Sequence, residues 1–245
     1  MHIRLVLATA GRVLRQLLHD PRTIAMMFVV PCVLLWLLSW IYSGSPIIFN
    51  VIGPSLLGIF PFVIMFLITS ITTLRERTSG TLERLLTMPI GKLDFLLGYA
   101  LVFGFFALLQ SLIASLLAVH VLGLVVAGPE WFLVLIAVVN AVLGTTLGLF
   151  VSAFATTEFQ AVQFMPAFIF PQFLLCGLLV PVAQMPRVLH DIANVLPLTY
   201  AVKAMQRVSV ESNVSAAAWH DILVVVAFAV AAIVLGAATL RRQTK

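Results

Sequence analysis

Long uncharged apolar stretches alternate with short charged segments along the chain. A helix needs about 20 apolar residues to cross a hydrocarbon core about 30 Å thick, and six stretches meet that requirement. They are continuously apolar and lack the alternation of barrel strands, so each predicts a transmembrane helix. The six predicted spans are Ile24–Ile41, Ile47–Leu74, Phe95–Val126, Trp131–Ala155, Phe159–Val182 and Ile222–Leu240.

The segment before the first span, residues 1–22, has an amphipathic pattern. On a helix, Leu7, Leu14, Leu17 and Leu18 share an apolar face, whereas Arg12, Arg15, His19 and Arg22 share a basic face. This pattern predicts a helix that lies in the membrane interface before the chain turns at Asp20–Pro21. A short soluble helix is the alternative.

The placement of Lys and Arg orients the predicted spans. Eleven of the 14 lie on one side: Arg4, Arg12, Arg15, Arg22, Arg75, Arg77, Arg84, Lys92, Arg241, Arg242 and Lys245. The other side holds Arg187, Lys203 and Arg207. Because positive charge collects on the cytoplasmic side of membrane proteins, both termini are expected in the cytoplasm.

The composition excludes several classes of protein. The 245 residues are 62% hydrophobic and 9% charged, whereas a soluble domain is about 45–50% apolar and about 25% charged. A soluble enzyme, a disordered chain and a collagen-like chain are therefore excluded. The net charge of +5 could indicate nucleic-acid binding, but the positive-inside rule explains it better, and no nucleic-acid partner is expected. We predict an all-α polytopic membrane protein with one domain, residues 1–245.

The sequence lacks the motifs that would indicate catalysis or cofactor binding by this chain. It has no phosphate-binding G-x-x-x-x-G-K-[ST], no zinc-binding H-E-x-x-H and no G-x-S-x-G nucleophile turn. Its acidic residues lie in loops or at span ends, so no buried carboxylate pair suggests a proton relay. Cys32 and Cys176 lie in apolar runs and suggest packing. These observations disfavour an intramembrane enzyme and a secondary transporter, and we expect no catalytic, metal or cofactor site.

Residues 75–89, between the second and third predicted spans, form a dense cluster of charge. On a helix, Leu82, Leu85 and Leu86 make an apolar stripe, and Pro89 ends the helix. The pairs Glu76 and Glu83, and Arg77 and Arg84, are each seven residues apart and each share a face. Either a docking helix at the cytoplasmic mouth of the bundle or a solvated loop helix fits this pattern.

This segment resembles the one that follows the second span in permeases of the ABC type-2 exporter family. The matching residues are Glu76, Gly80, Thr81, Glu83, Leu85, Leu86 and Pro89. A second similarity follows the fifth span, in Gly177–Pro181, Met185–Pro186 and Leu196–Ala201. The resemblance covers nearly the whole chain.

The resemblance implies a half-transporter in which two six-span permeases, identical or homologous, pair with two ATP-binding subunits that bind ATP and Mg²⁺. The coupling residues to the ATPase would be Glu76, Arg77, Gly80, Thr81, Glu83, Arg84 and Pro89. The outer stretch, residues 181–200, would form re-entrant helices that close an outer gate at Gly177, Pro181, Pro186, Pro197 and Thr199. An ordinary outer loop is the alternative.

The cargo is predicted from side-chain chemistry and from the same resemblance. The chain has 18 Phe but only 3 Tyr and 4 Trp, which suits a drug or another hydrophobic or amphipathic small molecule. These rings could equally face lipid or neighbouring helices. The expected function is a drug-exporting permease without enzymatic activity of its own, in the bacterial inner membrane. A lipid or glycoconjugate (polysaccharide) exporter is the alternative.

Overall fold

The computed structural model describes residues 3–78 and 91–239, and these residues form helices and connecting segments without a strand. The helices are α1 (Ile3–Leu18), α2 (Pro21–Ile41), α3 (Pro46–Thr78), α5 (Lys92–Leu116) with the π-helical turn η1 (Leu117–Val121), α6 (Glu130–Ser152), α7 (Glu158–Leu175), the 3-10 turn η2 (Val182–Gln184), α8 (Arg187–Ala193), α9 (Pro197–Val210) and α10 (Ala216–Thr239). The predicted all-α architecture is confirmed.

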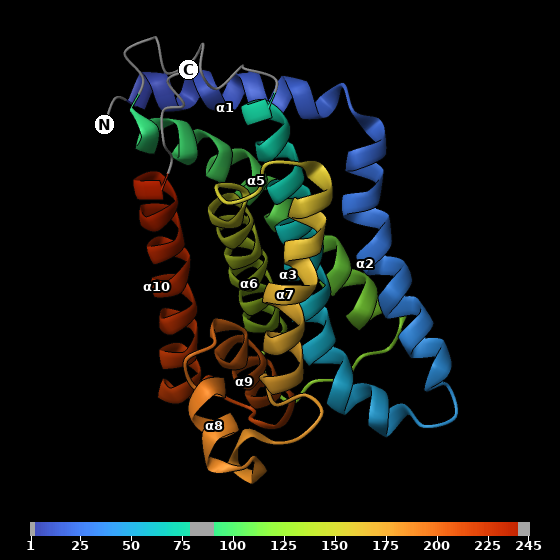
Figure 1. Ribbon diagram of the computed structural model, residues 1–245. Coiled ribbons are helices and arrows are strands. Elements are labelled where there is room, and N and C mark those ends of the chain that lie inside the picture. Colours follow the sequence, from blue (N-terminus) through green and yellow to red (C-terminus); the bar gives the residue numbers. More distant parts are fainter. Residues whose placement is uncertain (1–2, 79–90, 240–245) are drawn as a thin grey trace.

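The long helices form a bundle, and α1 lies across one end of it (Figure 1). Five elements are long and apolar enough to cross a membrane, namely α2, α3, α5 continued by η1, α6 and α10. They correspond to the first, second, third, fourth and sixth predicted spans. The third span ends at Val121, five residues before the predicted end, and Gly123 then turns the chain with φ of 71°.

The fifth predicted span corresponds to α7, which lies beside α3 in the bundle. It has 18 residues and ends at Leu175, seven residues before the predicted end. It contains Gln160, Gln163 and Gln172 and is not one of the five elements that are long and apolar enough to cross a membrane. The helix is therefore shorter than the fifth predicted span.

The predicted turn between α1 and α2 is confirmed. Asp20 caps α2, because its Oδ1 accepts a hydrogen bond from the Thr23 backbone N–H (3.2 Å) and its Oδ2 accepts one from the Thr23 hydroxyl (2.7 Å). Pro21 occupies the first position of the helix, where its missing N–H costs no hydrogen bond. The hydrogen bonds from Thr23 hold the pKa of the Asp20 carboxyl below its usual range. The chain therefore makes a well-defined corner at this point.

The closest helix contact in the bundle joins α3 to α6. The buried residues Asn140, Gly144, Gly148 and Ser152 recur every four residues along one face of α6. A Cβ atom on Gly148 would lie 2.5 Å from the carbonyl oxygen of Phe66 on α3. Small residues permit such an approach between membrane helices, because packing replaces the hydrophobic driving force that lipid does not provide. This contact forms the centre of the core.

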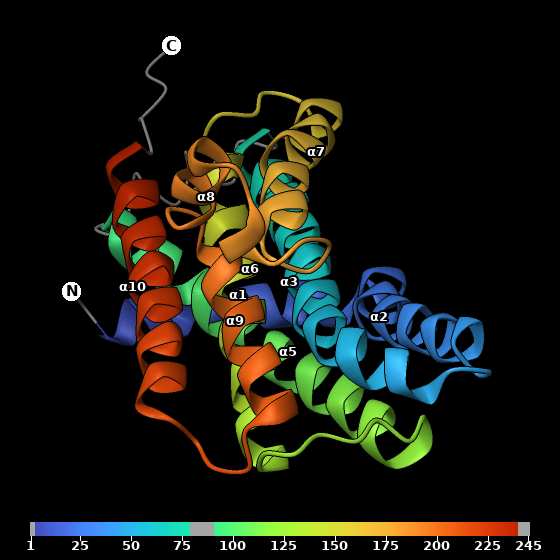
Figure 2. The same ribbon diagram turned by 90° about the horizontal axis from the view of Figure 1, so that it is seen from below.

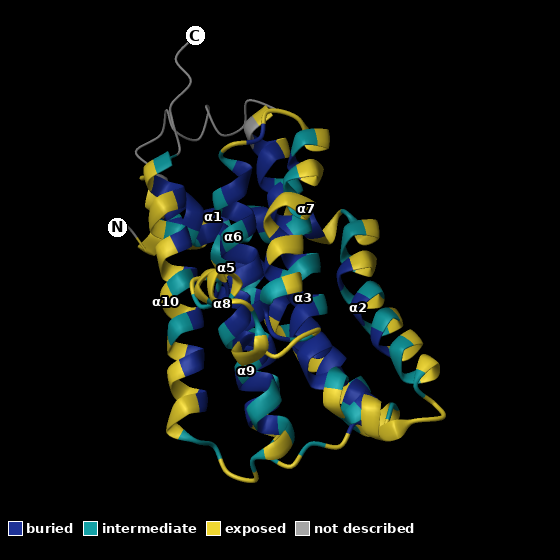
Figure 3. Cartoon of the chain, turned by 60° about the horizontal axis from the view of Figure 1, so that its bottom comes forward, coloured by how far each residue is buried: buried dark blue, intermediate teal, exposed yellow. Residues whose placement is uncertain are grey.

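α2 stands at one side of the bundle and is the most exposed of the five apolar helices (Figures 2 and 3). Pro31 lies inside it and has no N–H to donate to the carbonyl oxygen of Met27, four residues earlier. The side chain of Gln110 on α5 donates to that oxygen through Nε2 at 2.7 Å. A neighbouring helix thus satisfies the backbone group that the proline leaves open, as the apolar environment requires.

At the end opposite α1, the chain folds back onto the bundle. α9 packs against α3, α6 and α10, and Pro197, Leu198 and Thr199 are buried in its first turn. α9 continues to Val210, ten residues beyond the predicted 181–200 segment. The re-entry of this segment into the membrane stays a prediction.

The variant Gly144→Ala is expected to lower the thermal unfolding temperature of the purified protein in detergent. Its added Cβ would collide with the carbonyl oxygen of Phe62, a backbone atom that cannot rotate away. Overpacking costs about 1–3 kcal/mol, which exceeds the gain of about 1 kcal/mol in helix propensity. Gly104→Ala on α5 is the matched control, because its Cβ meets nothing within 4 Å. Equal unfolding temperatures for the two variants would contradict the assigned contact.

Candidate functional site

The last turn of α3 carries two adjacent charged residues, Arg75 and Glu76, that contact different helices. The Glu76 carboxylate is only 4% exposed and accepts two hydrogen bonds from Nη1 of Arg12 on α1, to Oε1 at 3.1 Å and to Oε2 at 2.9 Å. Nη2 of Arg12 donates to the hydroxyl of Tyr99 on α5 at 2.9 Å. Three helices therefore meet in one polar cluster, Arg12–Glu76–Tyr99.

The packing of α1 against α5 supports this cluster. The Tyr99 ring contacts the Phe95 ring at 4.5 Å between centroids, and the Arg12 guanidinium lies 5.9 Å from the Tyr99 centroid. A Cβ on Gly98 would be 2.7 Å from Cβ of Thr9, so this glycine lets α1 lie close to α5. The guanidinium is therefore held by packing as well as by hydrogen bonds.

Arg75 points instead to α7. Its Nε donates to Oε1 of Glu158 at 2.8 Å and its Nη2 to Oε2 at 3.0 Å, which makes a two-pronged ion pair. Both side chains are more than half exposed, 55% and 51%. The hydrogen bonds from Arg75 lower the pKa of the Glu158 carboxyl below its usual range. Exposed pairs contribute less than about 1 kcal/mol, so this link is the weaker of the two.

The structure corrects two sequence-based interpretations of this region, the placement of Arg12 and the start of the 75–89 helix. Arg12 was placed on one basic face with Arg15, His19 and Arg22, but it turns inward because the buried carboxylate of Glu76 needs a cationic partner. Glu76 was expected to contact an ATPase by its charge; its carboxylate is buried inside its own chain, and the contact with an ATPase stays a prediction. Residues 75–78 belong to α3, so the first four residues of the predicted 75–89 helix continue the second span, and the rest of that helix lies outside the described residues.

The other predicted coupling residues have no described side-chain environment. Arg77 is part of the last turn of α3. Gly80, Thr81, Glu83, Arg84 and Pro89 lie outside the described residues.

The predicted gate residues lie at the opposite end of the bundle. Gly177 has φ of 94°, a conformation that favours glycine, and its carbonyl oxygen accepts a hydrogen bond from Nε2 of Gln206 at 3.1 Å. Pro181 precedes η2 and Pro186 precedes α8. Pro197 and Thr199 lie in the buried first turn of α9. The structure thus places all five residues in or around the connections between α7, α8 and α9.

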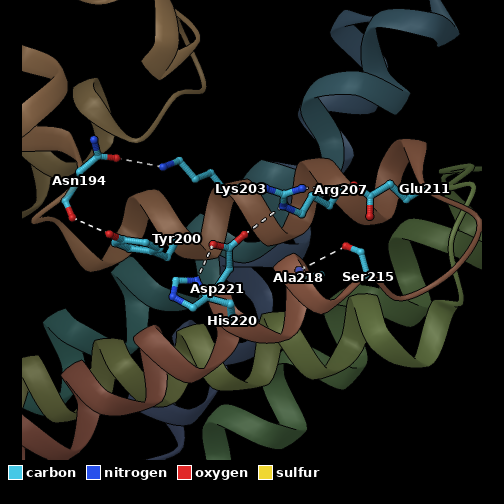
Figure 4. A network of polar contacts seen from close by, with 9 residues as sticks. All are labelled: Asn194, Tyr200, Lys203, Arg207, Glu211, Ser215, Ala218, His220 and Asp221. Atoms are coloured by element: carbon cyan, nitrogen blue, oxygen red, sulfur yellow. Dashed lines mark hydrogen bonds and ion pairs between the residues drawn. The ribbon is translucent and has the colours of Figure 1, made fainter. Parts of the chain in front are cut away.

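Figure 4 shows a polar network at this end that the sequence analysis missed. Nε of Arg207 on α9 donates to Oδ2 of Asp221 on α10 at 3.1 Å. Nζ of Lys203 donates to Oδ1 of Asn194 at 3.1 Å, and the Tyr200 hydroxyl donates to the Asn194 carbonyl oxygen at 2.7 Å. Lys203 and Arg207 were used only to orient the chain, although their four-residue spacing already placed them on one face.

Within the residues that the structure describes, no group of three or more His, Cys, Asp or Glu side chains could hold a metal ion. The charged clusters lie at the two ends of the bundle, with Arg12–Glu76–Tyr99 and Arg75–Glu158 at one end and the Arg207–Asp221 network at the other. Such clusters can hold helices together and transmit their displacement.

Comparison with known proteins finds a matching family and several related transporters. The pattern of the family described as ABC-2 type transporter matches residues 4–209. A probable multidrug ABC transporter permease of Escherichia coli K12 (YbhS) is 27% identical over 190 residues, which cover 77% of this chain and 50% of that protein.

Two further relatives are more distant or much longer. A second probable multidrug ABC transporter permease of E. coli K12 (YbhR) is 24% identical over 169 residues, or 69% of this chain and 46% of that protein. ABC transporter G family member 20 of Dictyostelium discoideum is 27% identical over 155 residues, or 63% and 21%. The chain spans about half the length of the bacterial relatives it matches.

The variant Glu76→Gln is expected to destabilise the protein by about 2 kcal/mol, because hydrogen bonds to charged groups contribute about 1.5–3 kcal/mol. The amide keeps the shape of the side chain but leaves Arg12 without its counter-charge. Thermal unfolding in detergent measures the loss. Glu158→Gln is the control and should cost less than about 1 kcal/mol. A larger loss for Glu158→Gln than for Glu76→Gln would contradict the ranking of the two ion pairs.

Proposed function

The chain belongs to the ABC-2 type transporter family, and from this premise we propose that it is the membrane permease subunit of an ATP-driven exporter. The observation that carries the proposal is the family match over residues 4–209, which takes in every described helix except α10. The apolar bundle supports a role in moving a compound across the membrane.

The energy is proposed to come from separate ATP-binding subunits, two copies that bind ATP and Mg²⁺ and dock beside the end of α3. Residues 79–90 follow directly after Thr78, and the proposed contacts are Arg77 in the last turn of α3 and Gly80, Thr81, Glu83, Arg84 and Pro89 in that segment. A displacement there would pass first into the last turn of α3. From that turn, Glu76 would move α1 through Arg12, and Arg75 would move α7 through Glu158.

In this proposal Glu76 transmits force, whereas direct docking falls to the residues that follow it. The buried carboxylate favours this division, because a charge that already has a partner inside its chain is poorly placed to bind another protein. The ion pairs that join the end of α3 to α1 and α7 also favour this division of roles, because coupling travels through packed elements and ion-pair networks.

The opposite end is proposed to form the outer gate. The buried first turn of α9, with Pro197 and Thr199, lies against the bundle, and the Arg207–Asp221 pair ties α9 to α10. A tilt of α9 would therefore need to break or carry along this ion pair. Gly177, Pro181 and Pro186 would set the path of the chain between α7 and α9.

The proposed cargo is a drug or another hydrophobic or amphipathic small molecule. Two relatives are named as probable multidrug permeases, and the chain is rich in Phe. A second permease copy, identical or homologous, would complete the transport path. We place the protein in the bacterial inner membrane with both termini in the cytoplasm, on the basis of its charge distribution and its bacterial relatives.

The decisive experiment is to purify the tagged protein in detergent from its native cells and to assay ATPase activity in what co-purifies. We expect a nucleotide-binding subunit whose ATPase rate changes when hydrophobic drugs are added. ATPase activity that responds only to lipids or glycoconjugates would assign the cargo to that class. A stable complex without any ATPase would overturn the permease proposal.

The variant Glu83→Ala tests the proposed docking segment in the same experiment. It should abolish drug export and ATPase co-purification while the protein remains in the membrane, because it removes a proposed docking charge without changing a span. Glu130→Ala is the matched control, since Glu130 is an exposed glutamate in the first turn of α6. Unchanged export by Glu83→Ala would contradict the docking role.

The orientation of the chain in the membrane can be tested in a variant that lacks the native cysteines Cys32 and Cys176. A single cysteine at Ser43, in the exposed turn between α2 and α3, should react with a membrane-impermeant maleimide added to intact cells. A single cysteine at Thr78, at the exposed end of α3, should react only after the membrane is opened. The reverse labelling pattern would invert the proposed topology.

A further inference from the structure

The outward side of α1 presents an apolar stripe that packs against no other helix. At about 3.6 residues per turn, Ile3, Leu7 and Leu18 line up on one side of the helix, whereas Leu14 packs against the buried core. Ile3, Leu7 and Leu18 are 67%, 59% and 58% exposed. The inward side is a different set, Val6, Thr9, Val13 and Leu17, which are buried. α1 therefore has two apolar sides, and the bundle covers only one of them.

A basic stripe runs beside the exposed apolar one. Arg4 and Arg15 are exposed on the neighbouring face, and Arg22 is exposed just beyond the corner with α2. Across residues 3–78 and 91–239, none of these three arginines takes part in an ion pair. Arg12 differs, because Glu76 already neutralises it. The outward surface of α1 therefore combines apolar side chains with positive charge that is not neutralised.

The position of α1 decides which partner suits this surface. α1 crosses the end of the bundle, next to the ends of the apolar helices (Figure 1). A helix at that level can place an apolar side against acyl chains and a basic side among headgroups. Arginine also forms two-pronged hydrogen bonds with phosphate oxygens, which favours a phosphate-bearing partner.

We propose that α1 binds anionic phospholipids through the headgroups at Arg4, Arg15 and Arg22, with an acyl chain along Ile3, Leu7 and Leu18. The arginines of this region thus divide into two roles: Arg12 fastens α1 to α3 and α5, while the outward arginines attach it to the lipid surface. This inference does not depend on the ATP-driven export proposed above.

The size of the effect follows from membrane electrostatics. Each Lys or Arg beside an anionic membrane surface contributes about 1 kcal/mol, which is about fivefold in affinity. Neutralising Arg4 and Arg15 together should therefore weaken binding on the order of 20-fold. The interaction should also weaken as salt is raised, because these charges are exposed.

The test uses the full chain in a neutral detergent, titrated with fluorescent phosphatidylglycerol or, for comparison, phosphatidylcholine. The wild-type protein should prefer phosphatidylglycerol, and the double variant R4Q/R15Q should lose most of that preference. R187Q is the control, because Arg187 is exposed on α8 at the opposite end. Leu7→Ser should weaken lipid binding with the unfolding temperature unchanged, since Leu7 packs little against the protein.

Four outcomes would overturn the proposal. Equal affinity for the two lipids would remove the role of headgroup charge. Phosphatidylglycerol binding that R4Q/R15Q leaves unchanged would place the lipid elsewhere on the protein. An equal loss in R187Q would mean a nonspecific charge effect. Full competition by soluble glycerol phosphate, with no effect of Leu7→Ser, would indicate a free-anion site instead of a lipid surface.

Discussion

The contact between the backbones of α3 and α6 is the constraint on which the rest of the structure depends. In lipid, apolar surface gives helices little reason to associate, so close packing must hold them together. Gly144 and Gly148 remove the side chains that would keep the helices apart, and Phe62 and Phe66 of α3 fill the adjoining space. Because α3 runs through the bundle and carries Arg75 and Glu76 in its last turn, its position against α6 also determines where both ion pairs form.

The two ion pairs attach the end of α3 to α1 and to α7 with different strengths. Adjacent residues on a helix point about 100° apart, so Arg75 and Glu76 can reach two different neighbours. The link to α1 is shielded by the buried carboxylate and by Tyr99, whereas the link to α7 is open to solvent on both sides. Water and salt can compete with the second link but hardly with the first. A displacement of α3 would therefore pass to α1 through the more protected link and to α7 through the weaker one.

The sequence was a good guide to the spans and a poor guide to their side-chain partners. Apolar length located the five long helices, and Asp20–Pro21 marked the corner, because both signals are local. The inward turn of Arg12 could not be predicted, since an amphipathic pattern assigns every arginine to water and Glu76 lies 64 residues away. The four-residue spacing of Gly144 and Gly148 was readable in the sequence, but only the structure shows that α3 is the helix it faces.

The attachment of α2 depends in part on one side-chain hydrogen bond inside the apolar bundle. Pro31 leaves the carbonyl oxygen of Met27 without its helical donor, and Gln110 supplies one from α5. Among the described residues, Oε1 of the same amide has no hydrogen-bond partner, so the connection is a single bond with an unpaired acceptor beside it. At its other end, α2 is capped firmly by Asp20 and follows α1. A movement that Glu76 delivers to α1 would therefore reach α2 through a stiff corner, and α2 would pass it on to α3 and α5, the helices against which it packs most.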